Sequence, residues 1–140
     1  MCNMLVVDAD IQQVYVLESL HRSLDSLHRY FYVNNGHAAL DFLYRRPPYE
    51  KAAPPDLILL DLNLPDITGC DVLRAIKADP KLRPIPIIIL SKSTSATDIQ
   101  ACYSEYANAY VVKPRDLDGH LRVVRAIESF WMNAASLTPH

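Results

Sequence analysis

Polar side chains suited to phosphate and metal chemistry follow several short apolar runs of the sequence. In chain order they are Asp8, Asp10, Asp61, Ser91 and Lys113. Clustered carboxylates repel each other and favour a hard cation, and Mg²⁺ typically takes one or two carboxylates together with waters and a phosphate. A carboxylate can also act as a nucleophile and form an aspartyl phosphate. These residue types therefore indicate phosphoryl transfer, provided that the fold brings them together.

Asp61 is the best nucleophile candidate because it follows the most strongly apolar run, LILL at 57–60. A carboxylate at the end of a buried parallel strand lies at the mouth of an open α/β sheet, where ligands bind. Ser91 can bond to a phosphoryl oxygen, and Lys113 can neutralise its charge. A lone aspartate would suit a turn or helix cap equally well, and only the polar residues at other strand ends favour the chemical role.

The elements that must position these residues alternate along the chain. Strands are predicted over 4–7, 30–33, 57–60, 85–90 and 109–112. Helices are predicted over about 11–24, 38–44, 70–78, 97–106 and from Asp116 or Asp118 to about Met132. Alternation of apolar strands with helices predicts a parallel sheet covered by helices on both faces. Parallel strands bring their carboxyl ends to one edge, so the polar residues are expected to converge there.

The composition predicts one domain with a real core, since half of the 140 residues are apolar. The net charge of -2 and the absence of a Lys/Arg cluster argue against nucleic-acid binding. Three glycines cannot build a glycine-rich nucleotide loop, and no apolar run is long enough for a membrane span. The cysteines, without CxxC spacing or a secretory signal, are expected to be reduced thiols in a cytoplasmic protein.

Several motifs together resemble the receiver domain of two-component response regulators over essentially the whole chain. They are Asp8 after LVV, Asp61 in LILLDLNLP, Gly69, Ser91 after PIIIL, and Tyr110 with Lys113 and Pro114 in NAYVVKP. The stretches DLILLDLNLP, LRAIKADP, ANAYVVKP and LRVVRAIESFW look most like stand-alone receivers that serve bacterial phytochrome-type histidine kinases. The resemblance implies an α/β, flavodoxin-like fold: a doubly wound five-stranded parallel sheet, in strand order 2-1-3-4-5, with five helices. It also implies a single receiver domain over 1–140 with no output domain.

The resemblance assigns roles residue by residue. It implies that Asp61 is the phosphoacceptor for a histidine kinase, and that Asp8, Asp61 and the backbone carbonyl of Asn63 bind Mg²⁺. It further implies that Ser91 and Lys113 contact the phosphate, and that Ser91 and Tyr110 form the conformational switch. The ring of Tyr110 would equally suit an aromatic at the edge of the core. Pro114 matches a proline that usually follows a cis peptide bond.

The sequence departs from the receiver pattern at two positions. The family's acidic pair consists of adjacent carboxylates, but the second position is Ala9, whose methyl group cannot bind a metal. Asp10 is the alternative ligand, although an offset of one residue at a strand end usually points the side chain elsewhere. Mg²⁺ binding is therefore expected to be weakened. The second departure is Lys92, which either supplies charge to the site or, as most lysines do, remains solvated.

Three functions stay open at this stage. The favoured one is a phosphoacceptor switch that signals by a change of conformation. The second is a protein-binding module that signals without phosphorylation, which Ala9 permits. The third is a phosphatase, since Asp8-Ala9-Asp10 resembles the D-x-D pair of haloacid-dehalogenase-type enzymes. The short chain, which has no room for a cap domain, argues against the third.

The last predicted helix carries a stripe of apolar residues, Leu117, Leu121, Val124, Ile127 and Trp131. Phe130 and Trp131 are adjacent and so point about 100° apart on a helix, which leaves one of them on the surface. We expect a homodimer through the face formed by the last two strands and helices, with these aromatics at or beside the contact. The five histidines show no metal-ligand spacing and are expected at the surface.

Overall fold

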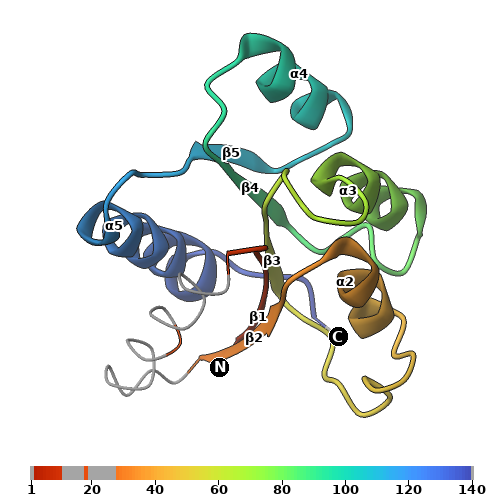
Figure 1. Ribbon diagram of the computed structural model, residues 1–140. Coiled ribbons are helices and arrows are strands. Elements are labelled where there is room, and N and C mark those ends of the chain that lie inside the picture. The colour runs from red at the N-terminus through yellow and green to blue at the C-terminus, as the bar shows by residue number, and fades with distance from the viewer. Residues whose placement is uncertain (1, 11–17, 19–27, 140) are drawn as a thin grey trace.

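A five-stranded parallel sheet organises the computed structural model, which describes residues 2–10, 18 and 28–139 (Figure 1). The strand order is β2-β1-β3-β4-β5, as predicted. The strands are β1 (Asn3–Val7), β2 (Arg29–Val33), β3 (Leu57–Leu60), β4 (Ile87–Ser91) and β5 (Ala109–Val112). β4 begins later than predicted because Ile85 closes a turn, its N–H donating to the carbonyl of Leu82 at 3.0 Å, and Pro86 has no N–H to donate.

The helices of the described chain are α2 (Gly36–Leu43), α3 (Gly69–Ala78), α4 (Ala96–Ser104) and α5 (Leu117–Ile127). A π-helix, η1 (Glu128–Ala134), continues α5. Each α-helix begins after a residue whose side chain accepts a backbone N–H of the first turn: Asn35, Thr68, Ser95 and Asp116. The helix predicted over about 11–24 falls mostly outside the described residues.

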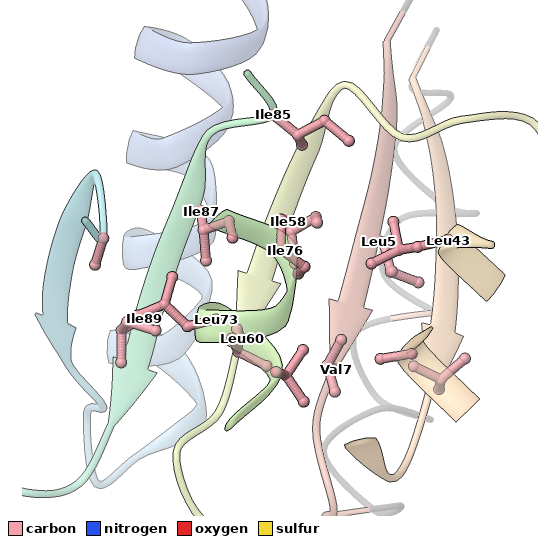
Figure 2. Packing of buried hydrophobic residues seen from close by; sticks show 14 of the residues in the cluster. Leu5, Val7, Leu43, Ile58, Leu60, Leu73, Ile76, Ile85, Ile87 and Ile89 are labelled. Atoms are coloured by element: carbon pink, nitrogen blue, oxygen red, sulfur yellow. The ribbon is translucent and has the colours of Figure 1, made fainter. Parts of the chain in front are cut away.

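Two side-chain clusters cover the two faces of the sheet. Alternate strand residues point to opposite faces, so Leu5 and Val7 join the cluster beneath α2 and α3, while Met4 and Val6 join the one beneath α5. Figure 2 shows the first cluster, in which side chains of β1, β3 and β4 meet Leu73 and Ile76 of α3. All four residues of β3 are buried, as an interior parallel strand requires. No helix of the described chain is long and apolar enough to span a membrane.

The stripe predicted for the last helix is partly wrong. Val124 and Ile127 are buried, but Leu117 is 46% exposed, and the buried position one turn before Val124 belongs to His120. Positions 120, 124 and 127, spaced by four and three residues, form the buried face of the helix. The histidine therefore takes a place that the sequence pattern gave to leucine.

Candidate phosphoacceptor site

Three charged side chains from separate strands meet at the carboxyl edge of the sheet. Lys113 Nζ lies 3.0 Å from Asp8 Oδ2 and 3.5 Å from Asp61 Oδ2. The parallel register brings these residues together, because Val7 is the partner of Leu60 and the Asp61 N–H donates to the Val7 carbonyl at 2.9 Å. After β5, the Lys113 N–H donates to the Ser91 carbonyl at 2.6 Å. The sequence-based expectation that these strand ends converge is confirmed for Asp8, Asp61 and Lys113.

The ion pair of Asp8 and Lys113 lies inside the protein, where the two residues are 2% and 6% exposed. Asp8 Oδ1 also accepts the N–H of Asp10 at 2.9 Å, so both of its oxygens are hydrogen-bonded. A buried ion of either sign is costly without its partner. Asp8 and Lys113 therefore stabilise each other's charged forms.

The side chain of Asp61 is less buried than that of Asp8. Burial raises the pKa of the Asp61 carboxyl, with a smaller contribution from the charge of Asp8. Lys113 and the N–H of Asn63, which donates to Asp61 Oδ1 at 3.2 Å, oppose that rise in pKa. The result is a partly desolvated carboxylate beside a lysine, an environment that suits a reactive group.

A solvent-accessible pocket of about 320 Å³ opens beside the Asp61 carboxylate. Its lining residues are Ala9, Asp10, Asp61, Asn63, Lys92 and Lys113. Lys92 is exposed, as the solvated interpretation predicts, and it also lines the pocket, as the charge-supplying interpretation requires. The two interpretations of this lysine are thus compatible.

The donors around this pocket fit a weak site for a hard divalent cation. Asp61 and Asn63 line the pocket, Asp8 shares Lys113 with Asp61 but does not line it, and Ala9 supplies no ligand. Within the described ranges there is no group of three His, Cys, Asp or Glu side chains placed to hold a metal. Mg²⁺ tolerates such a site, because it keeps several waters and needs only one or two carboxylates. Lys113 already contacts both carboxylates and would compete with the ion.

Ser91 and Tyr110 both bond to Ser93. Ser91 is buried at the end of β4, and its Oγ accepts the Ser93 N–H at 3.2 Å. The Tyr110 hydroxyl donates to the Ser93 carbonyl at 2.8 Å, while its half-buried ring packs against the cluster beneath α3. Ser91 is not among the described residues that line the pocket.

Sequence reasoning missed Ser93, which links this edge of the sheet to α4. Its Oγ donates to Asp98 Oδ2 at 2.5 Å and accepts the Ser95 N–H at 3.2 Å. Ser95 in turn caps α4. The run of polar residues before α4 was the available signal, since hydroxyl side chains in such runs bond to nearby backbone.

Gly69 lets α3 begin directly against the backbone of Asp61. A Cβ atom at this position would lie 2.3 Å from the Asp61 carbonyl oxygen and 2.7 Å from Leu62 Cα. The Gly69 N–H donates to the Leu62 carbonyl at 2.9 Å. The motif glycine is therefore required by a close backbone approach.

His120 contradicts the expectation of surface histidines. The residue is 1% exposed, and together with Asp8 and Asp61 it lines a crevice too small to hold a water molecule. Neither ring nitrogen has a hydrogen-bond partner in the part of the chain that the structure describes. Burial, helped by the charge of Lys113, lowers the pKa of His120 and keeps the ring neutral. Helical periodicity did not predict the burial of His120, because that analysis assigns only apolar residues to the buried face of a helix.

Of the other histidines, His37 is exposed as expected, and His28 is half-buried with its Nδ1 accepting the Cys2 N–H at 3.2 Å. His21 and His140 fall outside the described residues. The cis peptide bond expected before Pro114 is not found. In the described chain, the cis peptide bond lies between Pro47 and Pro48.

The adjacent aromatics of η1 divide as predicted. Phe130 is 57% exposed, whereas Trp131 is half-buried against the cluster beneath α5. Their ring centroids lie 5.3 Å apart with an interplanar angle of 85°. An exposed large aromatic is therefore present at the expected place.

The residues 4–125 match the family model of the response regulator receiver domain. The chain belongs to this family. It is a response regulator of the two-component type, as the resemblance implied. Response regulator Rcp1 of Synechocystis sp. is 38% identical over 134 residues, which cover 96% of this chain and 90% of Rcp1.

Two solved structures of such proteins share the fold. The Mn²⁺-bound form of Rcp1 has a TM-score of 0.91 and 33% identity, covering 99% of this chain and 100% of that one. The phosphorylated cyanobacterial phytochrome response regulator RcpA has a TM-score of 0.92 and 33% identity, covering 99% of each chain. These relatives agree with the motifs from which the family resemblance was drawn.

Proposed function

We propose that the chain accepts a phosphoryl group on Asp61 from the phosphohistidine of a histidine kinase. The observation that carries the proposal is that the Asp61 carboxylate lines an open pocket while its Oδ2 lies 3.5 Å from Lys113 Nζ. A carboxylate oxygen forms the new bond to phosphorus as the bond from phosphorus to the histidine nitrogen breaks. The electron pair of that bond remains on the imidazole.

Charge stabilisation is the main contribution of the protein to such a transfer. Lys113 is buried next to Asp61 and needs little rearrangement to meet a phosphoryl oxygen. Lys92, at the pocket wall, provides a second positive charge. The Asn63 N–H fixes Asp61 Oδ1.

Asp8, Asp61 and the Asn63 carbonyl would hold a divalent cation, with Asp10 as the alternative ligand. Mg²⁺ is the ion that such oxygen donors favour, and when bound it would neutralise charge on the phosphoryl group. The relative Rcp1, which has been solved with Mn²⁺, supports a divalent ion in this family. Ala9 makes the site weaker than one with two adjacent carboxylates.

Ser91 and Tyr110 would transmit the effect of phosphorylation from Asp61 to α4. If the Ser91 hydroxyl turns to a phosphoryl oxygen, the Ser93 N–H loses its acceptor. The loop before α4 is then held by the Tyr110 hydroxyl and by the contact of Ser93 with Asp98. Phosphorylation would in this way alter the position of α4.

The proposed kinase is of the phytochrome type, because RcpA is a phytochrome response regulator. The protein would work in the cytoplasm, without nucleic-acid or membrane partners, and as a homodimer with Phe130 and Trp131 at or beside the contact. The exposure of Phe130 supports that contact.

A second function rests on one specific observation, the alanine at position 9. If the cation site is too weak for phosphorylation, the chain would bind its partner without a phosphoryl group. This alternative keeps the receiver fold but gives Asp61 no covalent role.

Intact mass after incubation with acetyl phosphate and Mg²⁺ tests the proposal. We expect the gain of one phosphoryl group, lost in Asp61→Asn and kept in Asp118→Asn, which alters an exposed carboxylate on α5. No gain, combined with intact kinase binding, would favour the second function. Steady release of phosphate that depends on Asp8 would instead indicate a phosphatase.

A further inference from the structure

Two cysteines on neighbouring helices belong to one side-chain cluster. Cys70 is in the first turn of α3 and Cys102 is near the end of α4. Both belong to the same side-chain cluster, where Cys102 is fully buried and Cys70 is half-buried. Burial raises the pKa of the Cys102 thiol to about 12, and the charge and hydrogen bonding of the Cys70 thiol add to that rise. Cys70 and Cys102 therefore lie in the same cluster, close enough for the Cys70 thiol to influence the pKa of Cys102.

The pairing of the helices independently supports this proximity. One turn further along each helix, Arg74 Nε lies 3.2 Å from Glu105 Oε1. Arg74 follows Cys70 by four residues and Glu105 follows Cys102 by three, and such spacings keep residues on one face of a helix. Figure 1 shows α3 and α4 as neighbours. The two helices thus face each other along stripes that contain both cysteines.

The two thiols differ in accessibility. The side chain of Cys70 is partly exposed and accessible to a small oxidant, whereas Cys102 is fully buried on the inner face of α4. With a pKa of about 12, Cys102 is protonated at neutral pH, and so it is the slower nucleophile. Oxidation therefore begins at Cys70.

We propose that Cys70 and Cys102 form a reversible disulfide when the protein meets a peroxide. The Cys70 thiolate attacks a peroxide oxygen, the O–O bond breaks, and hydrogen peroxide leaves a sulfenic acid and, after protonation, one water. The Cys102 sulfur then attacks the Cys70 sulfur, the S–O bond breaks, and the departing hydroxide takes the Cys102 proton as a second water. The two thiols lose two electrons in total, and a dithiol reductant restores them.

Such a bond would tie α4 to α3. Cys102 is the one residue of α4 that the structure gives as buried, so this helix has little other apolar anchorage. Disulfides in cytosolic proteins are usually transient and redox-sensing. The cross-link would make the position of α4 respond to oxidants independently of any chemistry at Asp61.

The reduced full chain treated with a small excess of hydrogen peroxide, then alkylated under denaturing conditions, tests the proposal. We expect a mass lower by two hydrogen atoms before alkylation, one alkylatable thiol at Cys2, and a tryptic cross-link joining the peptides of Cys70 and Cys102. A dithiol reductant should reverse all three changes. Cys2→Ser, the matched control, should still form the cross-link, and so should Asp61→Asn, which separates this result from the proposed phosphorylation.

Cys70→Ser, at a half-exposed position, should abolish the cross-link and keep the native circular dichroism spectrum. Cys102→Ser should abolish it as well, but its buried site gives that variant less weight. Cys70 trapped as sulfinic acid with Cys102 still alkylatable would overturn the proposal, since it would mean that the two backbones stand too far apart for an S–S bond. A cross-link that involves Cys2 instead would also overturn it.

Discussion

The Tyr110 hydroxyl donates a hydrogen bond to the Ser93 carbonyl, with 2.8 Å between the oxygens. This bond joins β5 to the loop before α4. The Tyr110 N–H also donates to the hydroxyl of Tyr103, near the end of α4, at 3.0 Å. Tyr110 therefore contacts both ends of α4 by polar bonds. Since α4 buries little apolar surface, these bonds carry much of its attachment to the sheet.

Tyr110→Phe should loosen the loop before α4. The substitution removes the bond to the Ser93 carbonyl and should lower the free energy of unfolding by about 1 kcal/mol. Hydrogen exchange followed by mass spectrometry should show faster exchange over residues 92–98. Tyr106→Phe, at a highly exposed tyrosine, is the control and should leave both quantities unchanged. Unaltered exchange in Tyr110→Phe would mean that this bond does not hold the loop.

Lys113→Met should destabilise the protein strongly, because it leaves the buried Asp8 carboxylate without its cation. We expect a loss of about 3–5 kcal/mol in the free energy of unfolding, measured by urea denaturation. The double variant Asp8→Asn with Lys113→Met should recover part of that loss. Lys81→Met, at an exposed lysine, serves as the control. Additive effects of the two site substitutions would show that the pair is not coupled.

His120→Leu should stabilise the protein. It replaces a buried ring whose nitrogens have no partner in the described chain with an apolar side chain of similar size. Removing that desolvation cost should add about 1–3 kcal/mol to the free energy of unfolding. His37→Leu, at an exposed histidine, should not produce this gain. A loss of stability in His120→Leu would indicate that the ring has a polar partner in solution.

The same residue should make stability depend on pH. The pKa of His120 is lowered from 6.5 in the folded state, so the unfolded chain binds more protons below that value. Stability should therefore fall as the pH drops below about 6.5 and should level off only beneath the folded pKa. Urea denaturation across this range should show a smaller decline in His120→Leu than in the intact chain. Equal slopes would assign the pH dependence to other groups.

Ala9→Asp should tighten Mg²⁺ binding by restoring an anionic ligand at the site. Without the ion, the added carboxylate should lower stability because it crowds Asp8 and Asp61. Isothermal titration measures the first effect and thermal unfolding with a chelator the second. Ala9→Asn, which is similar in shape but neutral, should bind Mg²⁺ less tightly than Ala9→Asp. Identical titrations for the intact chain and Ala9→Asp would show that Asp10 already fills the position.

Phe130→Ala should weaken self-association. The exposed ring lies beside Trp131 on η1, and large aromatics at the centre of an interface often dominate its energy. Light scattering at high micromolar concentration should give a dimer for the intact chain and a smaller mean mass for Phe130→Ala. Leu117→Ala, at another exposed apolar residue, is the comparison. A monomeric intact chain would contradict the dimer, and a fully dimeric Phe130→Ala would move the contact elsewhere.

The fold could be predicted because its determinants are local. Apolar runs such as LILL at 57–60 and capping residues such as Asp116 identify strands and helix starts without knowledge of their neighbours. The parallel register then aligns the strand ends, which is why Asp8, Asp61 and Lys113 were expected together. The structure differs from the prediction at Ile85, which precedes β4, and at Leu117, which is exposed at the start of α5. Both residues lie at the ends of elements, where local turns and the edge of the sheet decide the structure.

The parts of the site that escaped prediction depend on tertiary placement. His120 is buried because it lies one turn before Val124 on the face of α5 that packs on the sheet, and a pattern of apolar residues does not reveal a buried histidine. The bonds of Ser93 join residues of β4, β5 and α4, so their pattern exists only after these elements pack. The continuation of the last helix to about Met132 was predicted, but its π-helical geometry over Glu128–Ala134 left no mark in the spacing of apolar residues.

Because Gly69 has no side chain, the start of α3 packs directly on the backbone of Asp61, and the positions of the two are coupled. Because only a hydrogen atom separates the first residue of α3 from the Asp61 carbonyl, neither backbone can shift without displacing the other. The start of α3 thus limits how far the backbone of Asp61 can move toward it. The accuracy with which Asp61 is aimed into its pocket is set by a residue that carries no chemistry of its own.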